Sequence, residues 1–294
     1  MSFAGSLYQA IRTLNPPGVA PDTDTTAWRF VSGGNGSAGG GGVSCASPRP
    51  GANLIGCQFT TAPNALKDKD LTGANLSKSL VIGDLGSIDL TGAKILNAFW
   101  GQVGQGNVFQ PVILSSSASL AYADLSGLYT TGNAALQAQG VNFRRATITD
   151  AQIQGANLQG ANFNGANLEA SSFGGAHMEG ADLSNAKVKG TDYYYAFLSD
   201  ANLSGVNLSE AAPLEGVDLT RATIAGADLR KSFLTNVNLT GAYLGYSNLS
   251  GAHIQNVTIG NDPTTGDTNF EYATCPDNTY VDTQIVTTCV GHGF

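Results

Sequence analysis

Three histidines are the side chains best suited to acid–base chemistry or to metal binding in this sequence. They are His177, His253 and His292, and their spacing matches no metal-ligand motif. No serine can be grouped with a histidine and an aspartate into a catalytic set. We therefore predict a protein that is not an enzyme, with no catalytic residues, no metal centre, no cofactor and no small-molecule substrate.

Oxygen-bearing side chains cluster in one segment, NDPTTGDTNFE at 261–271, which contains Asp262, Asp267, Asn269 and Glu271. Calcium prefers oxygen ligands of this kind. The spacing does not match an EF-hand loop, and the same residue types are common in turns. Whether this segment binds calcium stays open at the level of sequence.

Four cysteines offer a different chemistry. Cys275 and Cys289 flank PDNTYVDTQIVTT, in which two alternating apolar pieces and a turn would bring the two thiols together as a stapled hairpin. Cys45 and Cys57 are a second candidate pair, although Cys57 could instead fill a small inward position as a free thiol. A disulfide implies an oxidising compartment, and we expect the protein to be extracellular or at a cell surface.

A repeat of five residues organises most of the chain. From Val141 the sequence divides into units such as ANLQG, ANFNG and ADLSN, with a small residue first and a large apolar residue third. One extra residue enters near Ala211, beside Pro213, and we expect a small bulge there. In total, 24 consecutive units run to Ile259. The third positions that we predict to form a core ladder include Phe143, Ile148, Ile153, Leu158, Phe163, Leu168, Phe173, Leu183, Leu203, Leu219, Leu229, Leu239 and Leu249.

A period of five fits neither a helix nor a simple strand, so the chain must turn at regular intervals. The small and the large apolar residue are two positions apart, which places them on the same side of a short extended segment. The polar residues of each unit then face outward. We predict an all-β solenoid in which the large residue fills the axis.

The units resemble the pentapeptide-repeat family, whose consensus is A(D/N)LXX, and ANLQG, ANFNG, ANLEA, ADLSN, ANLSG and ADLRK match it closely. The resemblance implies a right-handed, four-sided (quadrilateral) parallel β-helix with four units per coil. The 24 units would make about six coils and a regular rod of roughly 29 Å. The tail resembles the endings, with CPD before a later cysteine, of bacterial surface or secreted repeat proteins.

The remaining segments define four regions. Residues 1–51 are expected to be an N-terminal cap, with a short helix in SLYQAIRTL and a Gly-rich linker at 32–42. Residues 52–140 read as irregular repeat coils of the same solenoid, with loops or bulged coils at 101–117 and 128–139. Residues 141–259 are the regular β-helix, and 260–294 are a C-terminal cap.

Composition limits the partners. Only 12% of residues are charged and the formal net charge is −8, which argues against nucleic acid as a partner. No apolar run is long enough to span a membrane, and the N-terminus MSFAGSLYQAIRTLNPPGVA lacks the pattern of a secretory signal. Tyr194, Tyr195, Tyr243 and Tyr246 are expected to form an exposed contact surface.

These features favour a structural or scaffold protein that binds proteins, above all its own copies, and assembles into fibres or larger bodies through its ends or faces. The alternative is DNA mimicry, which the resemblance implies through the quinolone-resistance branch of the family, proposed to bind type II topoisomerases. Residues 141–259 carry ten acidic and seven basic side chains, a net charge of −3. This charge is small for an imitation of DNA.

Overall fold

The computed structural model describes residues 43, 45–59, 65–103, 109–130, 135–209, 213–262, 266–281 and 288–294. The chain divides into two units, Met1–Ser32 and Gly33–Phe294, and every described residue belongs to the second. The helix expected in SLYQAIRTL and the Gly-rich linker lie outside the described residues.

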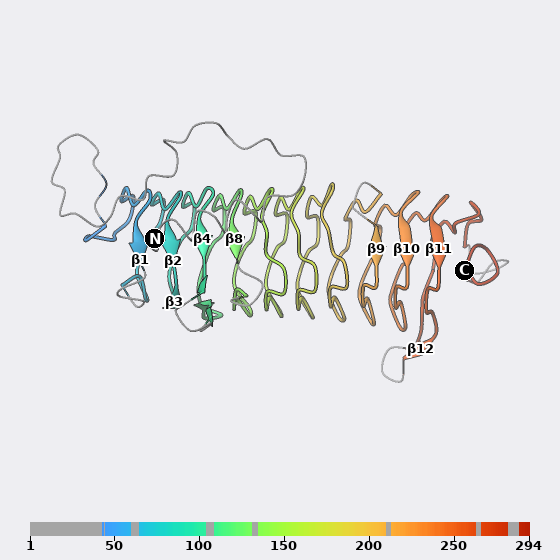
Figure 1. Cartoon of the computed structure of the whole chain (residues 1–294). Coiled ribbons are helices and arrows are strands. Elements are labelled where there is room, and N and C mark those ends of the chain that lie inside the picture. Colours follow the sequence, from blue (N-terminus) through green and yellow to red (C-terminus); the bar gives the residue numbers. More distant parts are fainter. Residues whose placement is uncertain are drawn as a thin grey trace, which may run out of the picture. The chain divides into compact units, whose positions relative to one another are not determined.

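The described residues contain short strands and no helix. They form successive coils that stack along one axis (Figure 1). The strands are β1 (Gln58–Phe59), β2 (Leu80–Val81), β3 (Gly83–Gly86), β4 (Phe99–Trp100), β5 (Gln102–Val103), β6 (Phe109–Gln110), β7 (Val112–Leu114), β8 (Tyr129–Thr130), β9 (Leu214–Glu215), β10 (Phe233–Thr235), β11 (His253–Gln255), β12 (Asn261–Asp262) and β13 (Gly266–Asp267).

Four columns of parallel pairs run along the solenoid. Asn142 pairs with Asn162, and Asn162 with Asp182, so one coil takes 20 residues, or four repeat units. We name the four sides by their columns. Face A carries β1, β2, β4, β8, β9, β10 and β11; face B carries β3 and β7 and ends at Thr258; face C runs from Asp70 to Asn269; face D runs from Asn53 to Thr274. The predicted four-sided parallel β-helix is confirmed.

The third residue of each unit points into the interior. Each such residue from Phe143 to Leu249 is at most 3% exposed. The interior is aromatic near its middle, where Phe163 stacks on Phe143 at 4.8 Å between ring centroids and meets Phe173 edge-on at 6.2 Å. Buried hydroxyls at the small first position donate to backbone carbonyls, as Thr191 does to Leu168 at 2.8 Å. The coil interior is therefore closely filled.

The second residue of each unit explains the Asp/Asn preference of the repeat. Where this residue is Asp or Asn, its side-chain oxygen accepts a hydrogen bond from the backbone N–H two residues on, for example from Ser184 to Asp182 at 3.0 Å and from Ser204 to Asn202 at 3.1 Å. This Asx turn fixes the bend between two faces. The fifth residue then takes a positive φ, which glycine adopts most readily, as at Gly205.

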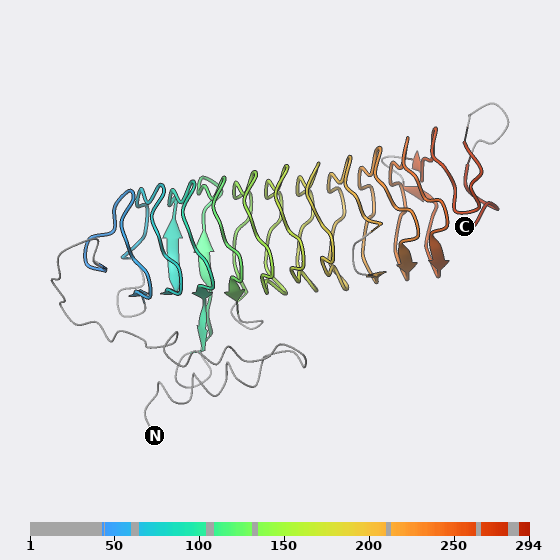
Figure 2. The same ribbon diagram turned by 90° about the horizontal axis from the view of Figure 1, so that it is seen from above.

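The irregular region 52–140 belongs to the same solenoid. On face C, Asp89 pairs with Ser119 and Ser119 with Asn142 without a break. The segment 101–117 contains the antiparallel hairpin β5–β6, which leaves the coil, and β7, which returns to it (Figure 2). In 128–139 the small and large positions are exchanged, because Leu136 occupies the first and Ala138 the third, and both are buried.

The ladder continues beyond residue 259, where the sequence pattern placed its end. Tyr243 pairs with Asn269 and Asn248 with Thr274, so Phe270 and Cys275 occupy third positions on faces C and D. The hairpin β12–β13 interrupts the repeat between Ile259 and Asn269 and hides this continuation from the period of five. At the other irregularity, residues 210–212 lie outside the described residues, and the register resumes at Leu214.

Candidate interaction surfaces

Buried, mainly apolar side chains fill the described core of the coils, and the exposed candidate residues lie on the surface. Tyr193 is the most polar of the large buried side chains, and its hydroxyl has no hydrogen-bond partner among the described residues. Burial raises the pKa of this hydroxyl, which therefore stays protonated. Among the described residues no three His, Cys, Asp or Glu side chains converge as a metal site would require.

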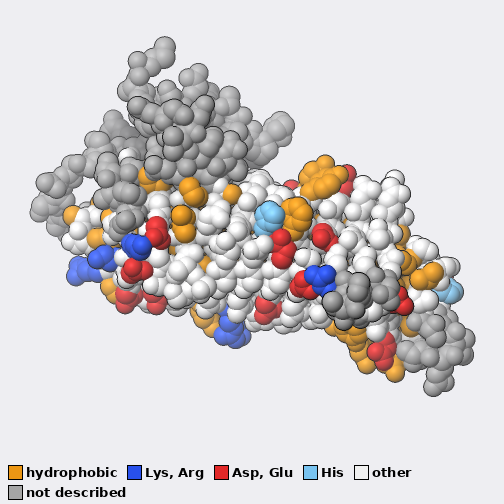
Figure 3. All heavy atoms as spheres, turned by 90° about the horizontal axis from the view of Figure 1, so that it is seen from below, with side chains coloured by type: hydrophobic (Ala, Val, Ile, Leu, Met, Phe, Trp, Pro, Cys, Tyr) orange, Lys and Arg blue, Asp and Glu red, His pale blue; other side chains and the backbone are white. Residues whose placement is uncertain are grey.

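Tyr194 and Tyr195 lie at the corner between faces A and B and are 49% and 48% exposed. Their rings meet edge-on at 4.5 Å. Phe197, 41% exposed, follows at the start of face B and stacks on His177 at 4.6 Å. We call these four residues the corner patch. Figure 3 views the solenoid from the side of face B and shows hydrophobic side chains gathered beside a histidine on an otherwise largely polar surface.

The local sequence holds the corner patch in place. A Cβ at Gly216 would lie 2.6 Å from the Tyr195 ring, so only glycine in the next coil leaves space for that ring. Glu179 accepts a hydrogen bond from His177 at 3.1 Å. Burial raises the pKa of the Glu179 carboxyl, but the His177 contact and further hydrogen bonds outweigh burial, and the net shift is downward. The carboxylate therefore stays ionised under the imidazole.

Tyr243 and Tyr246 do not join the corner patch. Tyr243 is on face C and half-buried, and Tyr246 is 62% exposed at the corner between faces C and D, diagonally opposite. Tyr246 stacks on Tyr272 of the next coil at 5.1 Å. The expectation of one surface of four tyrosines is therefore wrong. Consecutive units lie on different faces of the solenoid, and two exposed residues are neighbours when they lie on the same face or corner in adjacent coils.

Two further aromatic contacts were not found from the sequence. Phe233 on face A is 51% exposed and stacks on His253 of the next coil at 4.5 Å. Both residues are second positions of their units, and they align because they are 20 residues apart. The same separation relates His177 to Phe197, so a search for aromatic residues at this spacing would have found both pairs.

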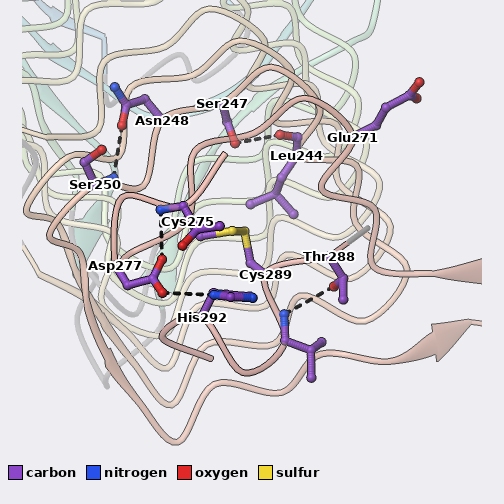
Figure 4. Close-up of a disulfide and its surroundings, with 12 residues drawn as sticks. Leu244, Ser247, Asn248, Ser250, Glu271, Cys275, Asp277, Thr288, Cys289 and His292 are labelled. Atoms are coloured by element: carbon purple, nitrogen blue, oxygen red, sulfur yellow. Dashed lines mark hydrogen bonds and ion pairs between the residues drawn. A yellow bond between two sulfur atoms is a disulfide. The ribbon is translucent and has the colours of Figure 1, made fainter. Parts of the chain in front are cut away.

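Both cysteine pairs are joined. The Cys45–Cys57 disulfide closes a separation of 12 residues at the N-terminal end, and the Cys275–Cys289 disulfide closes one of 14 at the C-terminal end. Near the second disulfide, His292 contacts Asp277 at 3.0 Å (Figure 4). The backbone N–H of Thr279 is the largest cause that lowers the pKa of Asp277, and His292 adds to it.

In the acidic segment 261–271 the side chains of Asp267, Asn269 and Glu271 are described, and that of Asp262 is not. Asn269 is on face C and its side-chain oxygen accepts the N–H of Glu271 at 2.7 Å, as in the other Asx turns. Asp262 and Asp267 lie on the two strands of the hairpin β12–β13, Asp262 opposite Gly266. Among the described residues no helix has the length and apolar character needed to cross a bilayer.

Comparison with known proteins identifies the repeat. Residues 139–192 match a family model of pentapeptide repeats with nine copies, and residues 196–236 and 218–256 match a second with eight copies. These residues belong to the pentapeptide-repeat family. Pentapeptide-repeat solenoids are right-handed β-helices, as expected here, and the family is generally non-enzymatic and binds proteins.

Solved pentapeptide-repeat proteins match this chain at low sequence identity and low TM-score. HetL, involved in heterocyst differentiation regulation in the cyanobacterium Nostoc sp. strain PCC 7120, is 24% identical over 79% of this chain and 90% of its own, with a TM-score of 0.42. QnrB1, a plasmid-mediated fluoroquinolone resistance protein, is 21% identical over 61% and 91%, with a TM-score of 0.31. A protein of the Arabidopsis thaliana thylakoid lumen is 27% identical over 44% and 82%, with a TM-score of 0.19. No curated protein matches the chain in sequence.

Proposed function

We propose that this pentapeptide-repeat protein is a non-enzymatic structural scaffold that binds proteins, including its own copies, and assembles into fibres or larger bodies. The observation that carries the proposal is the corner patch. Three aromatic side chains that are at least 41% exposed, Tyr194, Tyr195 and Phe197, lie together on one corner of the rod. Clustered aromatic residues of this kind are typical of the centre of a protein–protein contact.

The scaffold role is supported by how the coils hold together. Parallel pairs on the faces join neighbouring coils along the described solenoid, and the coils share one apolar core, so each coil stabilises its neighbours. Disulfides at both ends of the repeat favour an oxidising location, and we propose an extracellular or surface site on that ground.

DNA mimicry, the alternative, finds no specific support on the surface. A mimic of phosphates needs a continuous row of carboxylates. Here Arg221 contacts Asp200 at 2.6 Å, and Arg230 contacts Asp228 at 2.6 Å. Basic side chains therefore interrupt the acidic ones.

The test compares two sets of substitutions in the full chain. The patch variant carries Tyr194→Ser, Tyr195→Asn and Phe197→Thr. The control carries Tyr122→Asn, because Tyr122 is also exposed, at 53%, and takes the same positive φ as Tyr195, but lies at another corner. Sedimentation velocity over a concentration series should show self-association of the wild type and of the control.

The patch variant should associate at least about tenfold more weakly, which corresponds to about 1.4 kcal/mol. Circular dichroism spectra of all three proteins should be the same, since the substituted side chains face outward. A wild type that sediments as a monomer at every concentration would contradict self-association. Equal weakening by Tyr122→Asn would show that the corner patch has no special role.

A further inference from the structure

The C-terminal end of the solenoid is closed on two of its four sides. Faces C and D are extended by Asn269 and Thr274, and the chain then turns back, where Thr274 pairs antiparallel with Tyr280. Faces A and B end in the same last coil, at β11 and at Thr258, and among the described residues no further strand pairs with either of them. The described part of the tail therefore adds to faces C and D, where Phe294 also packs against Phe270, and not to faces A and B.

Apolar side chains remain partly exposed at the ends of faces A and B. Ile254, Val257 and Ile259 pack against the core but are only partly buried. Their counterparts one coil earlier are Leu234, Val237 and Leu239, which are at most 1% exposed. A terminal coil that ends in water is expected to carry polar residues in these places. These positions instead carry apolar residues like those of an internal coil. A further coil stacked on them would bury their side chains.

The two ends of face A carry complementary backbone edges. β11 is the last strand of the sheet β11-β10-β9, and β1 is the first strand of the sheet β1-β2-β4-β8. Both belong to face A, and all their pairings within the solenoid are parallel. A strand edge is a template for one more strand of the same kind. A second copy placed coil upon coil would set its β1 beside β11 in the register of the solenoid.

Charge distinguishes the two ends. From Ser232 to the last residue the sequence has five acidic side chains and no lysine or arginine. Residues 43–78, at the other end of the solenoid, have four basic side chains against two acidic ones. In Figure 3 blue side chains are seen at the N-terminal end and along the rod, and none at the C-terminal end. Two C-terminal ends would repel one another, whereas a C-terminal and an N-terminal end attract.

We propose that copies of this chain join head to tail, with faces A and B of the C-terminal end covered by the basic N-terminal coil of the next copy. This inference rests on the proposed self-association and adds a contact between ends to the side contact proposed for the corner patch. The contact uses two different surfaces and does not close on itself, so it generates a filament with the coils continuing along its axis. Because acidic and basic ends meet, assembly weakens as salt concentration rises.

Charge reversal at surface side chains tests the proposal without touching the core. The N-end variant is Arg49→Glu with Lys69→Glu, and the C-end variant is Asp267→Lys with Glu271→Lys. A mid-rod control, Arg144→Glu with Lys187→Glu, changes the net charge as much as the N-end variant does. Arg49, Lys69, Arg144 and Lys187 are all exposed. Thermal unfolding of each variant checks that the fold is kept.

Each end variant alone should polymerise at least about tenfold more weakly than the wild type, and the control should match the wild type. An equimolar mixture of the two end variants should regain filaments, because each acidic end then meets a basic one. Filaments can return in this mixture only if the C-terminal end of one copy contacts the N-terminal end of another. A tail-to-tail contact would leave the N-end variant unaffected, and that result would overturn the inference.

The outcomes separate this inference from the proposed function. If the wild type assembles and neither end variant weakens assembly, the head-to-tail geometry is wrong and self-association stands. If the corner-patch variant alone loses assembly, the copies join through faces rather than ends. If the wild type stays monomeric at low salt and high concentration, the ends are covered by the chain's own segments and both proposals fail.

Discussion

Replacing Phe163 by alanine should unfold the middle of the rod more readily than any exposed substitution of the same type. Phe163 is 1% exposed and lies at the third position of its unit. Its ring stacks on Phe143, with 2° between the ring planes, and meets Phe173 edge-on from the other side of the interior. Truncation to alanine leaves a cavity between the rings of Phe143 and Phe173.

The size of the destabilisation follows from the burial of this ring and from its two aromatic neighbours. Cutting a buried phenylalanine to alanine costs about 3 to 5 kcal/mol. Each aromatic pair contributes about 0.5 to 1.5 kcal/mol beyond area, so a site with two pairs belongs in the upper half of that range. We expect the free energy of unfolding to fall by about 4 kcal/mol.

Urea denaturation and amide hydrogen exchange measure this decrease. The matched control is Phe197→Ala, since Phe197 has the same side chain but is 41% exposed, and it should cost about 1 kcal/mol or less. Exchange should accelerate at the amides of the coil that contains Phe163 and in its two neighbours. Equal costs for the two substitutions would refute the assignment of inward and outward positions.

Two further predictions concern acid and reductant. The hydrogen bond from the Arg230 guanidinium is the largest cause that lowers the pKa of Asp228, and it outweighs partial burial. The ionised Asp228 therefore stabilises the fold above its unfolded pKa of about 3.9. This stabilisation is lost as pH falls through the lower, folded pKa. Asp228→Asn should flatten the acid limb of the stability curve, and an unchanged limb would contradict this. Replacing Cys275 and Cys289 by serine should destabilise the last coil by about 3 kcal/mol, given the separation of 14 residues. A denaturation curve that is unaffected by reductant would contradict that expectation.

The repeat was predictable because its interior imposes a strict period. The large side chain at every fifth position from Phe143 is buried in the interior, and the small residue two positions earlier is buried beside it. The period of five did not predict the core where a hairpin is inserted into the repeat or where the large and the small residue exchange positions. The hairpin β12–β13 hides the return of the ladder at Phe270, and the exchange of Leu136 with Ala138 leaves the core filled while the pattern disappears.

Surface groupings were less predictable, because neighbours in sequence turn to different sides. Tyr194 and Tyr243 looked like members of one surface, but Tyr194 is at the corner between faces A and B and Tyr243 is on face C. The pairs that do meet, such as His177 with Phe197, are 20 residues apart and require the number of units per coil. That number came from the family resemblance, and the period of five alone does not supply it.

Fibre diffraction from aligned assemblies tests the central claim most directly. If copies continue one another's coils, the spacing of about 4.8 Å between neighbouring strands must lie along the filament axis. We predict a meridional reflection at about that spacing from the filaments. Filaments with this reflection on the equator, or well-folded protein that forms no filaments at low salt, would contradict the account.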